Sequence, residues 1–261
     1  MQGVEQEVER LCQAGLDLDA VRTRVLRSLN RVMPVDTAFV ATADPRTLLF
    51  SGVAVDEPLA AVSQQFLDNE FGGTDVNHFA ALAMASPHVG SLDHATHLER
   101  SASPRYREIM RPLGLGDELR AALVVGGDCW GYLCLHREDH RLGFTEDEAE
   151  LVAKIGPHLA HALRQSVLLT AATAPAPSGP GVVLLAEDLT LLAATPQAEQ
   201  FLDQLGGVET VPVPLRGVAS ALRSSAAGVL PSVRVRTRTG AWLAVHASRL
   251  RGTDRYAGLT R

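Results

Sequence analysis

The chain has 261 residues, of which 46% are apolar and 21% are charged, so it can bury a sizeable core and is neither fibrous nor largely disordered. Its 24 lysine and arginine residues against 30 aspartate and glutamate residues give a net charge of −6, which excludes a general attraction to nucleic acid. The apolar runs are far shorter than the roughly 20 residues of a membrane span, and the acidic N-terminal segment is unlike a secretory signal. We therefore expect a cytoplasmic protein without a membrane partner.

The N-terminal region predicts two helices and two strands. Apolar residues recur every three or four positions over residues 18–33, which predicts an amphipathic helix that ends at Pro34. Short strands are predicted at residues 37–42 and 48–53, and the turn between them favours a hairpin. A second helix is predicted over residues 58–71.

A second hairpin is predicted at residues 119–137, where two apolar runs flank a tight glycine turn. Side chains of a strand alternate between its two faces, which places four residues of the second strand on one face: Trp130, Tyr132, Cys134 and His136. Both faces of this strand are largely apolar. We therefore expect the sheet to be covered on both sides.

The clearest helix signal of the chain is a capping box that starts at Thr145. The Thr145 hydroxyl can accept a hydrogen bond from the backbone three residues on, and Glu148 can reach back. Apolar periodicity continues from there and predicts a helix over residues 145–169, which Pro157 is expected to bend.

A proline- and glycine-rich segment, residues 171–181, predicts a linker. It divides the chain into a first domain, residues 1–170, and a smaller second domain, residues 182–261. The second domain is predicted to contain a short hairpin around an acidic turn, a helix over residues 196–205 and a long hairpin over residues 233–250. Arg234, Arg236 and Arg238 alternate on that last hairpin and predict a solvated face rather than a nucleic-acid contact.

Several segments carry a resemblance to known domains. RPLGLGDELRAALVV, CWGYLCLHR followed by GFTEDEAELV, and GPHLAHALR resemble the GAF domain of LuxR-type transcription regulators of actinobacteria. GVVLLAEDLTLLAATPQAEQFL and RVRTRTGAWLAVHASRL resemble the opening and the closing hairpin of a degenerate PAS domain.

The resemblance implies an α+β fold, in which a GAF-like antiparallel sheet flanked by helices is followed by a smaller, incomplete PAS-like domain. It also implies a ligand-sensing region that regulates transcription, forms a homodimer and contacts DNA only through a helix-turn-helix domain absent from this chain. The helix over residues 145–169 is expected to relay ligand binding to whatever follows it.

A small-molecule pocket in such a domain lies between one sheet face and the segments that cover it. Residues 74–112, where apolar periodicity is weak, are predicted to form the lid. The candidate ligand-binding residues come from this lid and from the facing sheet: Phe39, Phe50, His78, Phe79, Met84, His88, Trp130, Tyr132 and Cys134. The alternative for each of them is ordinary core or surface packing.

No catalytic residue, metal site or cofactor is predicted, and we expect the chain not to be an enzyme. Two His-x-x-His pairs, at residues 94–97 and 158–161, lack a third ligand at a recognisable spacing. Cys129 and Cys134 are five positions apart, which places them on opposite faces of an ideal strand. A GAF-type thiol-dependent reductase and a dimerisation scaffold that binds no ligand remain the alternatives.

Overall fold

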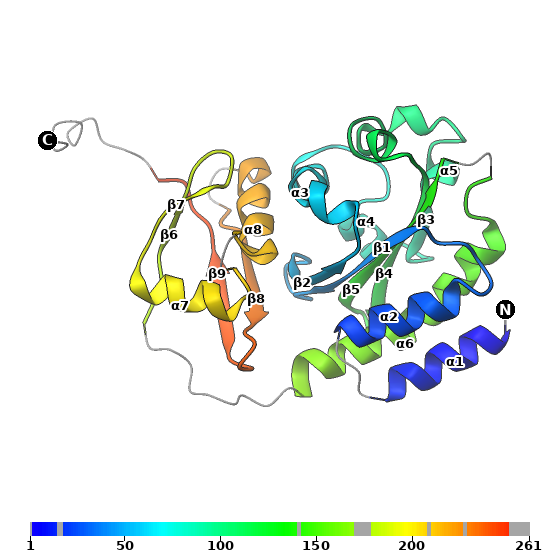
Figure 1. The fold of residues 1–261 in the computed structure, drawn as a ribbon, viewed down its shortest axis with the longest axis horizontal. Helices are drawn as coiled ribbons and strands as arrows, with labels where there is room; N and C mark the ends of the chain where they lie inside the picture. The colour runs from blue at the N-terminus through cyan, green and yellow to red at the C-terminus, as the bar shows by residue number, and fades with distance from the viewer. Residues whose placement is uncertain are drawn as a thin grey trace, which may run out of the picture.

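The computed structural model describes residues 2–14, 18–139, 142–169, 179–207, 210–226 and 229–250 (Figure 1). Of the predicted linker, residues 179–181 are described and the others lie outside these ranges, as do residues 251–261 of the predicted second domain. Below, residues 2–169 are called the N-terminal part and residues 179–250 the C-terminal part.

The N-terminal part is built on a five-stranded antiparallel sheet with the strand order β2-β1-β5-β4-β3. Its strands are β1 (Thr37–Ala43), β2 (Phe50–Val55), β3 (Val89–Ser91), β4 (Leu115–Val125) and β5 (Asp128–Glu138). Both predicted hairpins are confirmed, and β5 lies at the centre of the sheet between β1 and β4. Helices cover both faces, so the α+β fold with a helix-flanked sheet is as predicted.

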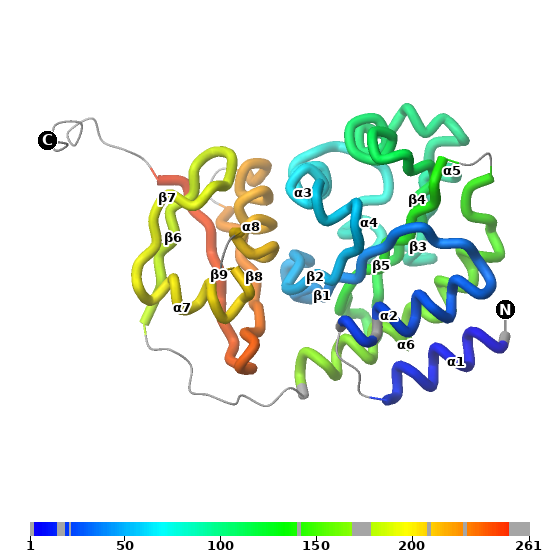
Figure 2. Tube along the Cα trace, in the orientation of Figure 1, coloured from blue at the N-terminus to red at the C-terminus, as the bar shows by residue number. Residues whose placement is uncertain are grey.

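Three helices cover one face of the sheet (Figures 1 and 2): α1 (Gln2–Gln13), α2 (Leu18–Leu29) and α6 (Glu146–Leu169). The capping box of α6 is present, since the Glu148 backbone N–H donates to Thr145 Oγ1 at 3.3 Å and the Thr145 backbone N–H donates to Glu148 Oε2 at 2.8 Å. Helix α1 was not predicted. It packs along α6 and covers part of the apolar stripe of that helix.

The other face is covered by a series of short helices within residues 59–113, on either side of β3. These are η1 (Leu59–Val62), α3 (Ser63–Gly72), α4 (Phe79–Met84), α5 (Leu92–Ala95), η2 (Arg100–Ala102), the π-helical turn η3 (Tyr106–Met110) and η4 (Arg111–Leu113). The predicted irregular lid is therefore mostly helical. The helices of the lid are too short for a periodic apolar pattern to be visible in the sequence.

A β-bulge at Trp130 overturns one prediction about the sheet. Leu123 pairs with Gly131 and Val124 pairs with Cys129, so Trp130 is an extra residue on β5. Its side chain packs on the α6 face, whereas Tyr132 and Cys134 belong to the opposite face. The bulge also brings Cys129 to the same face as Cys134, and both are free, buried thiols.

The C-terminal part contains two separate two-stranded sheets and two helices. The elements are β6 (Val183–Leu185), β7 (Leu191–Ala194), α7 (Pro196–Gln204), α8 (Val213–Ser224), β8 (Ser232–Arg236) and β9 (Trp242–His246). Both hairpins and the helix α7 are as predicted. Helix α8 was not predicted, and it is the element that faces the N-terminal part (Figure 1).

The two parts pack against each other along α3 and α8, a contact that we call the seam. Ser220 Oγ donates to Asp68 at 2.7 Å, and Val218, Val233 and Val235 form one apolar cluster with Leu49. Arg234 pairs with Asp44 of the N-terminal part while its side chain stays 48% exposed, so the predicted solvated position holds and the ion pair with the other part is the new finding. Within the described ranges, none of the helices has the length and apolar character needed to cross a bilayer.

Candidate functional site

A cavity of about 190 Å³ lies at the seam between the N-terminal sheet, α3 and α8. It is lined by Phe39, Phe50, Val53, Val55, Leu59, Ala60, Ser63, Phe66, Leu67, Val213 and Arg216. The aromatic and leucine side chains of this set are buried and form its floor, while the other lining residues are partly exposed and form its rim. The cavity is therefore an apolar hollow with a small polar rim, which is the usual character of a small-molecule site.

Arg216 is the charged residue of this lining. One of its terminal N–H groups donates to Ser63 Oγ at 3.2 Å. Its Nε is shielded from solvent and has no hydrogen-bond partner among the described residues. Burial lowers the pKa of Arg216. Within the described part of the chain, Arg216 is therefore a cation that lacks an anionic partner.

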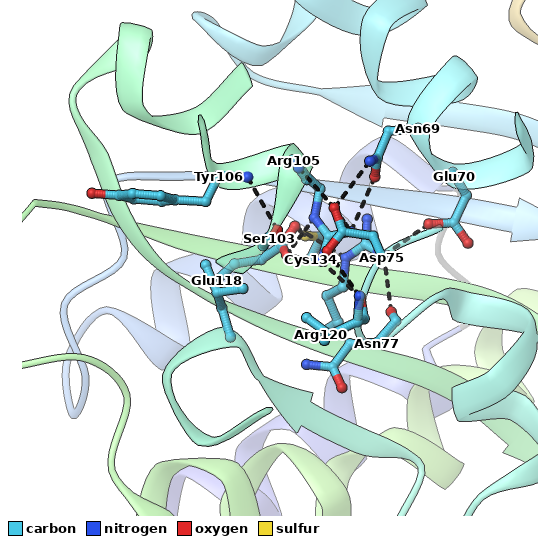
Figure 3. Close-up of polar contacts among 12 residues, drawn as sticks. Asn69, Glu70, Asp75, Asn77, Ser103, Arg105, Tyr106, Glu118, Arg120 and Cys134 are labelled. Atoms are coloured by element: carbon cyan, nitrogen blue, oxygen red, sulfur yellow. Dashed lines mark hydrogen bonds and ion pairs between the residues drawn. The ribbon is translucent and has the colours of Figure 1, made fainter. Parts of the chain in front are cut away.

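A network of buried ion pairs lies on the same sheet face and joins β4 to α3 and to Arg105 of the lid (Figure 3). Glu118 accepts from Arg105 Nε at 2.8 Å and from Arg120 Nε at 3.0 Å. Arg120 also donates to Glu70 at 2.7 Å. Arg105 additionally bonds Asn69 Oδ1 at 3.1 Å. The four charged side chains are at most 2% exposed, and each charge has a partner of opposite sign.

The strand register explains why these charges meet. Arg120 is paired with Cys134 across β4 and β5, and Glu118 is paired with His136. Alternation along each strand therefore directs all four side chains to the same face. The Cys134 thiol donates to Glu118 Oε1 at 3.1 Å and lies 3.2 Å from His136 Nε2.

The ionisation of this network follows from burial and from the two arginines. Burial acts to raise the pKa of Glu118, but attraction by Arg105 and Arg120 outweighs it and holds that pKa well below its usual value. Burial lowers the pKa of His136 to about 4, so the ring is neutral at pH 7. Burial and the neighbouring Glu118 raise the pKa of the Cys134 thiol, which is therefore protonated.

Glu118, Cys134 and His136 bring three potential metal-ligand atoms within 4.8 Å of one another. However, both carboxylate oxygens of Glu118 already accept hydrogen bonds from Arg105 and Arg120. Two guanidinium groups at this distance would repel a cation in a medium of low dielectric. The arrangement stabilises the core and is poorly suited to a metal.

An aromatic cluster fills the space under α4. The ring of Phe79 stacks on Tyr132 with centroids 4.5 Å apart, and Phe39 meets Phe79 edge-on at 5.8 Å. The guanidinium of Arg120 lies 4.2 Å above the Phe79 ring. Because side chains occupy this region, the open volume lies next to it, at the seam.

The nine predicted ligand-binding residues fall into three groups. Phe39 and Phe50 line the cavity. Phe79, Tyr132 and Cys134 lie on the same sheet face but are buried in the filled core.

The remaining four residues lie outside the cavity. His78 Nε2 accepts from the Asp75 backbone N–H at 2.9 Å, and the His88 ring bonds the Leu82 carbonyl at 3.0 Å, so both histidines hold the lid together. Met84 is 84% exposed, because it ends α4 on the side away from the sheet core. Trp130 lies on the α6 face because of the bulge, with Arg164 above its ring. Ligand binding by any of the nine residues stays a prediction.

Arg216 and Val213, the two cavity residues from α8, were not predicted from the sequence. The only local signal is the apolar period of residues 213–224, which does not show what the helix packs against. The network of Glu118 and Arg120 was not predicted either. The available signal for this network was a pair of opposite charges, two positions apart, inside an otherwise apolar strand.

Several solved structures are similar to part of this chain at low sequence identity. The chromophore-binding domain of an unusual bacteriophytochrome from R. palustris is 12% identical with a TM-score of 0.44, and the match covers 62% of this chain and 60% of that chain, less than two thirds of its length. The A. aeolicus nlh2 GAF domain in an inactive state is 15% identical with a TM-score of 0.41, covering 62% of this chain and 94% of that chain. The GAF domain from an Acinetobacter phosphoenolpyruvate-protein phosphotransferase is 12% identical with a TM-score of 0.42, covering 63% and 93%.

No curated protein has a sequence that matches this chain. The family model described as GAF domain matches residues 17–163, which is more than half of the chain. These residues hold the whole five-stranded sheet and the helices on both of its faces, except α1 and the last residues of α6. The chain therefore belongs to the GAF domain family.

Proposed function

We propose that this chain is the sensory region of a LuxR-type transcription regulator, in which a small molecule binds at the cavity in the seam. GAF domains are ligand-sensing regulatory domains, which is the starting point of the proposal. The observation that carries it is the cavity of about 190 Å³ with a buried apolar floor. The C-terminal part is proposed to be the degenerate PAS-like domain that receives the signal.

The location of the cavity supports a direct route for the signal. Its floor belongs to the N-terminal part, whereas Val213 and Arg216 belong to α8. A molecule in the cavity touches both parts, so its binding energy depends on how they are docked, and by linkage it shifts that docking equilibrium.

The relay through α6 remains part of the proposal as a second route. Helix α6 covers the sheet face opposite to the cavity, and its Val167 carbonyl accepts a hydrogen bond from Arg236 on β8. A change in docking at α8 would therefore also act on the last turns of α6. In the same way, a shift of α6 on the sheet would act on β8 through this contact, which is the relay from the N-terminal part to the C-terminal part.

We further propose that the chain works in the cytoplasm as a homodimer, catalyses no reaction, and contacts DNA through a helix-turn-helix domain outside this chain. The environment of the three cysteine thiols argues against a thiol-dependent reductase activity. Cys12, Cys129 and Cys134 are all buried, and burial raises the pKa of each of them. A reactive cysteine is normally accessible and has a lowered pKa.

Ligand capture with a cavity-filling variant tests the proposal. The protein is dialysed against a bacterial metabolite extract, and bound molecules are identified by mass spectrometry in the wild type, in Ala60→Trp and in Ala61→Trp. Ala60 lines the cavity, whereas its neighbour Ala61 is exposed and does not, which makes it the matched control.

The expected result is a molecule enriched by the wild type and by Ala61→Trp but not by Ala60→Trp, with slower amide hydrogen exchange over residues 213–224 when it is bound. Val53→Phe, which fills the rim from β2, replaces Ala60→Trp if that variant does not fold. Equal enrichment by all variants, or no enriched molecule, would favour the scaffold alternative and overturn the proposal.

A further inference from the structure

Arg216 differs from the other arginines at the seam. Arg223, two turns further along α8, pairs with Asp68 at 3.2 Å. Arg234 on β8 pairs with Asp44 at 2.8 Å. Arg216 has a serine hydroxyl as its hydrogen-bond partner and no carboxylate partner among the described residues.

Without an anionic partner, the charge of Arg216 lies in an unfavourable environment. A guanidinium cannot lose its charge at physiological pH, and its shielded Nε–H has lost water without gaining an acceptor. The surroundings are the apolar side chains of the cavity, including Val213 one turn earlier on the same helix. An anionic acceptor beside Arg216 would supply the missing interaction.

The shape of the guanidinium specifies the kind of anion. Its planar fork of N–H donors matches the two oxygens of a carboxylate, and such bonds are short and charge-assisted. Ser63 Oγ is already at the rim beside Arg216, and its hydroxyl proton can donate to the same anion. The polar end of the cavity therefore offers donors to one negatively charged group.

The rest of the cavity specifies the body of the ligand. Its floor consists of Phe39, Phe50, Leu59, Phe66 and Leu67 and carries no polar side chain. A cavity of about 150 Å³ with a similar lining holds benzene, so about 190 Å³ accommodates one aromatic ring or a short acyl chain.

We propose that the cavity at the seam binds a small monocarboxylate with an apolar body, whose carboxylate pairs with Arg216 and whose body fills the hollow between β1, β2 and α3. This proposal rests on the proposed function and adds the chemical class of the ligand. It also assigns Arg216 as the residue of the C-terminal part that detects the bound molecule, because the body of the ligand is held mainly by the N-terminal part.

Calorimetric titration with octanoate and octanamide tests the charge requirement, because the two probes share a chain and differ in the charge of the head group. The wild type is expected to bind octanoate at least about tenfold more tightly than octanamide. Arg216→Met is expected to remove this preference, and Arg216→Lys is expected to retain part of it because the positive charge remains.

Arg223→Met is the matched control. It removes the same charge from the same helix and weakens the seam, but Arg223 does not line the cavity. It is expected to keep the preference for octanoate. Equal affinity of the wild type for both probes, a preference retained in Arg216→Met, or no saturable binding of octanoate would overturn the inference.

The titration and the capture experiment together distinguish a wrong ligand class from a wrong binding site. If the metabolite extract yields a neutral molecule that Ala60→Trp excludes, the cavity is a ligand site and only the carboxylate class is wrong. If Ala60→Trp changes neither capture from the extract nor octanoate binding, both the site and its ligand class are wrong.

Discussion

Asp44 and Arg234 are 190 positions apart in the chain, and the guanidinium of Arg234 binds both carboxylate oxygens of Asp44, at 2.8 and 3.1 Å. The backbone N–H of Arg234 also donates to Asp44 at 2.9 Å. The Asp44 side chain is 2% exposed and that of Arg234 is 48% exposed. This bidentate pair joins the end of β1 to β8 and fixes the docking of the two parts beside the cavity.

Asp44→Asn is expected to weaken that docking. The neutral amide cannot form the charge-assisted pair, and because Arg234 stays half-exposed the loss in the free energy of unfolding is about 1–2 kcal/mol. Urea unfolding measures the loss, and faster hydrogen exchange in β8 locates it at the seam. Arg238→Gln is the control, since Arg238 pairs with Asp203 inside the C-terminal part and both side chains are 65% exposed. Equal effects of the two variants would show that the Asp44 pair does not hold the parts together.

His136 is expected to make stability depend on pH. Burial lowers its pKa to about 4; Glu118 opposes this shift, and Arg120 and Arg105 favour it. The unfolded chain binds a proton near the ordinary value of 6.5, so the folded state loses stability as the pH falls from about 6.5 to about 4.

The loss from this one residue is on the order of 3 kcal/mol. Urea unfolding of the wild type and of His136→Gln between pH 7.5 and pH 4 isolates it, because the variant keeps the carboxylates and lacks the imidazole. Parallel stability curves for the two proteins would contradict the assignment.

Glu118→Gln is expected to destabilise the fold by about 3 kcal/mol or more. It leaves the buried guanidinium groups of Arg105 and Arg120 without the carboxylate that they share. Glu150→Gln breaks the Glu150–Lys154 pair, whose side chains are more than half exposed, and should leave the stability nearly unchanged. Chemical denaturation of both variants provides the comparison, and losses of similar size would mean that the network is not a core element.

Gly131→Ala is expected to cost about 3 kcal/mol or more. A Cβ at this position on β5 would overlap the Ala41 carbonyl oxygen of the neighbouring strand and Cδ1 of Leu163 on α6. Gly3→Ala is the control, because a Cβ at Gly3 in α1 meets nothing within 4 Å and alanine is a better helix former. We expect a lowered melting temperature for the first variant and an unchanged or raised one for the second. A neutral Gly131→Ala would contradict the packing at the centre of the sheet.

The sequence was informative wherever the signal is local. The helix after Thr145 was predicted from four consecutive residues, because a cap and its partner are three positions apart. The β4–β5 hairpin followed from alternation and a glycine turn. Trp130 was assigned to the wrong face because a bulge depends on the pairing of β5 with its neighbour strand, which alternation does not report.

The amino-acid sequence by itself determined the α+β class, the hairpins, most of the longer helices and the presence of Phe39 and Phe50 near the hollow, because periodicity and turn chemistry act over a few residues. The tertiary structure alone decided that α8 closes the cavity, that Arg234 pairs with Asp44 and that Arg216 has no carboxylate partner among the described residues. These outcomes depend on which surfaces meet after the chain has folded. The sequence does not show whether the partner of a charged residue lies 2 or 190 positions away. The interaction energy of such a pair depends on how far the folded structure buries it.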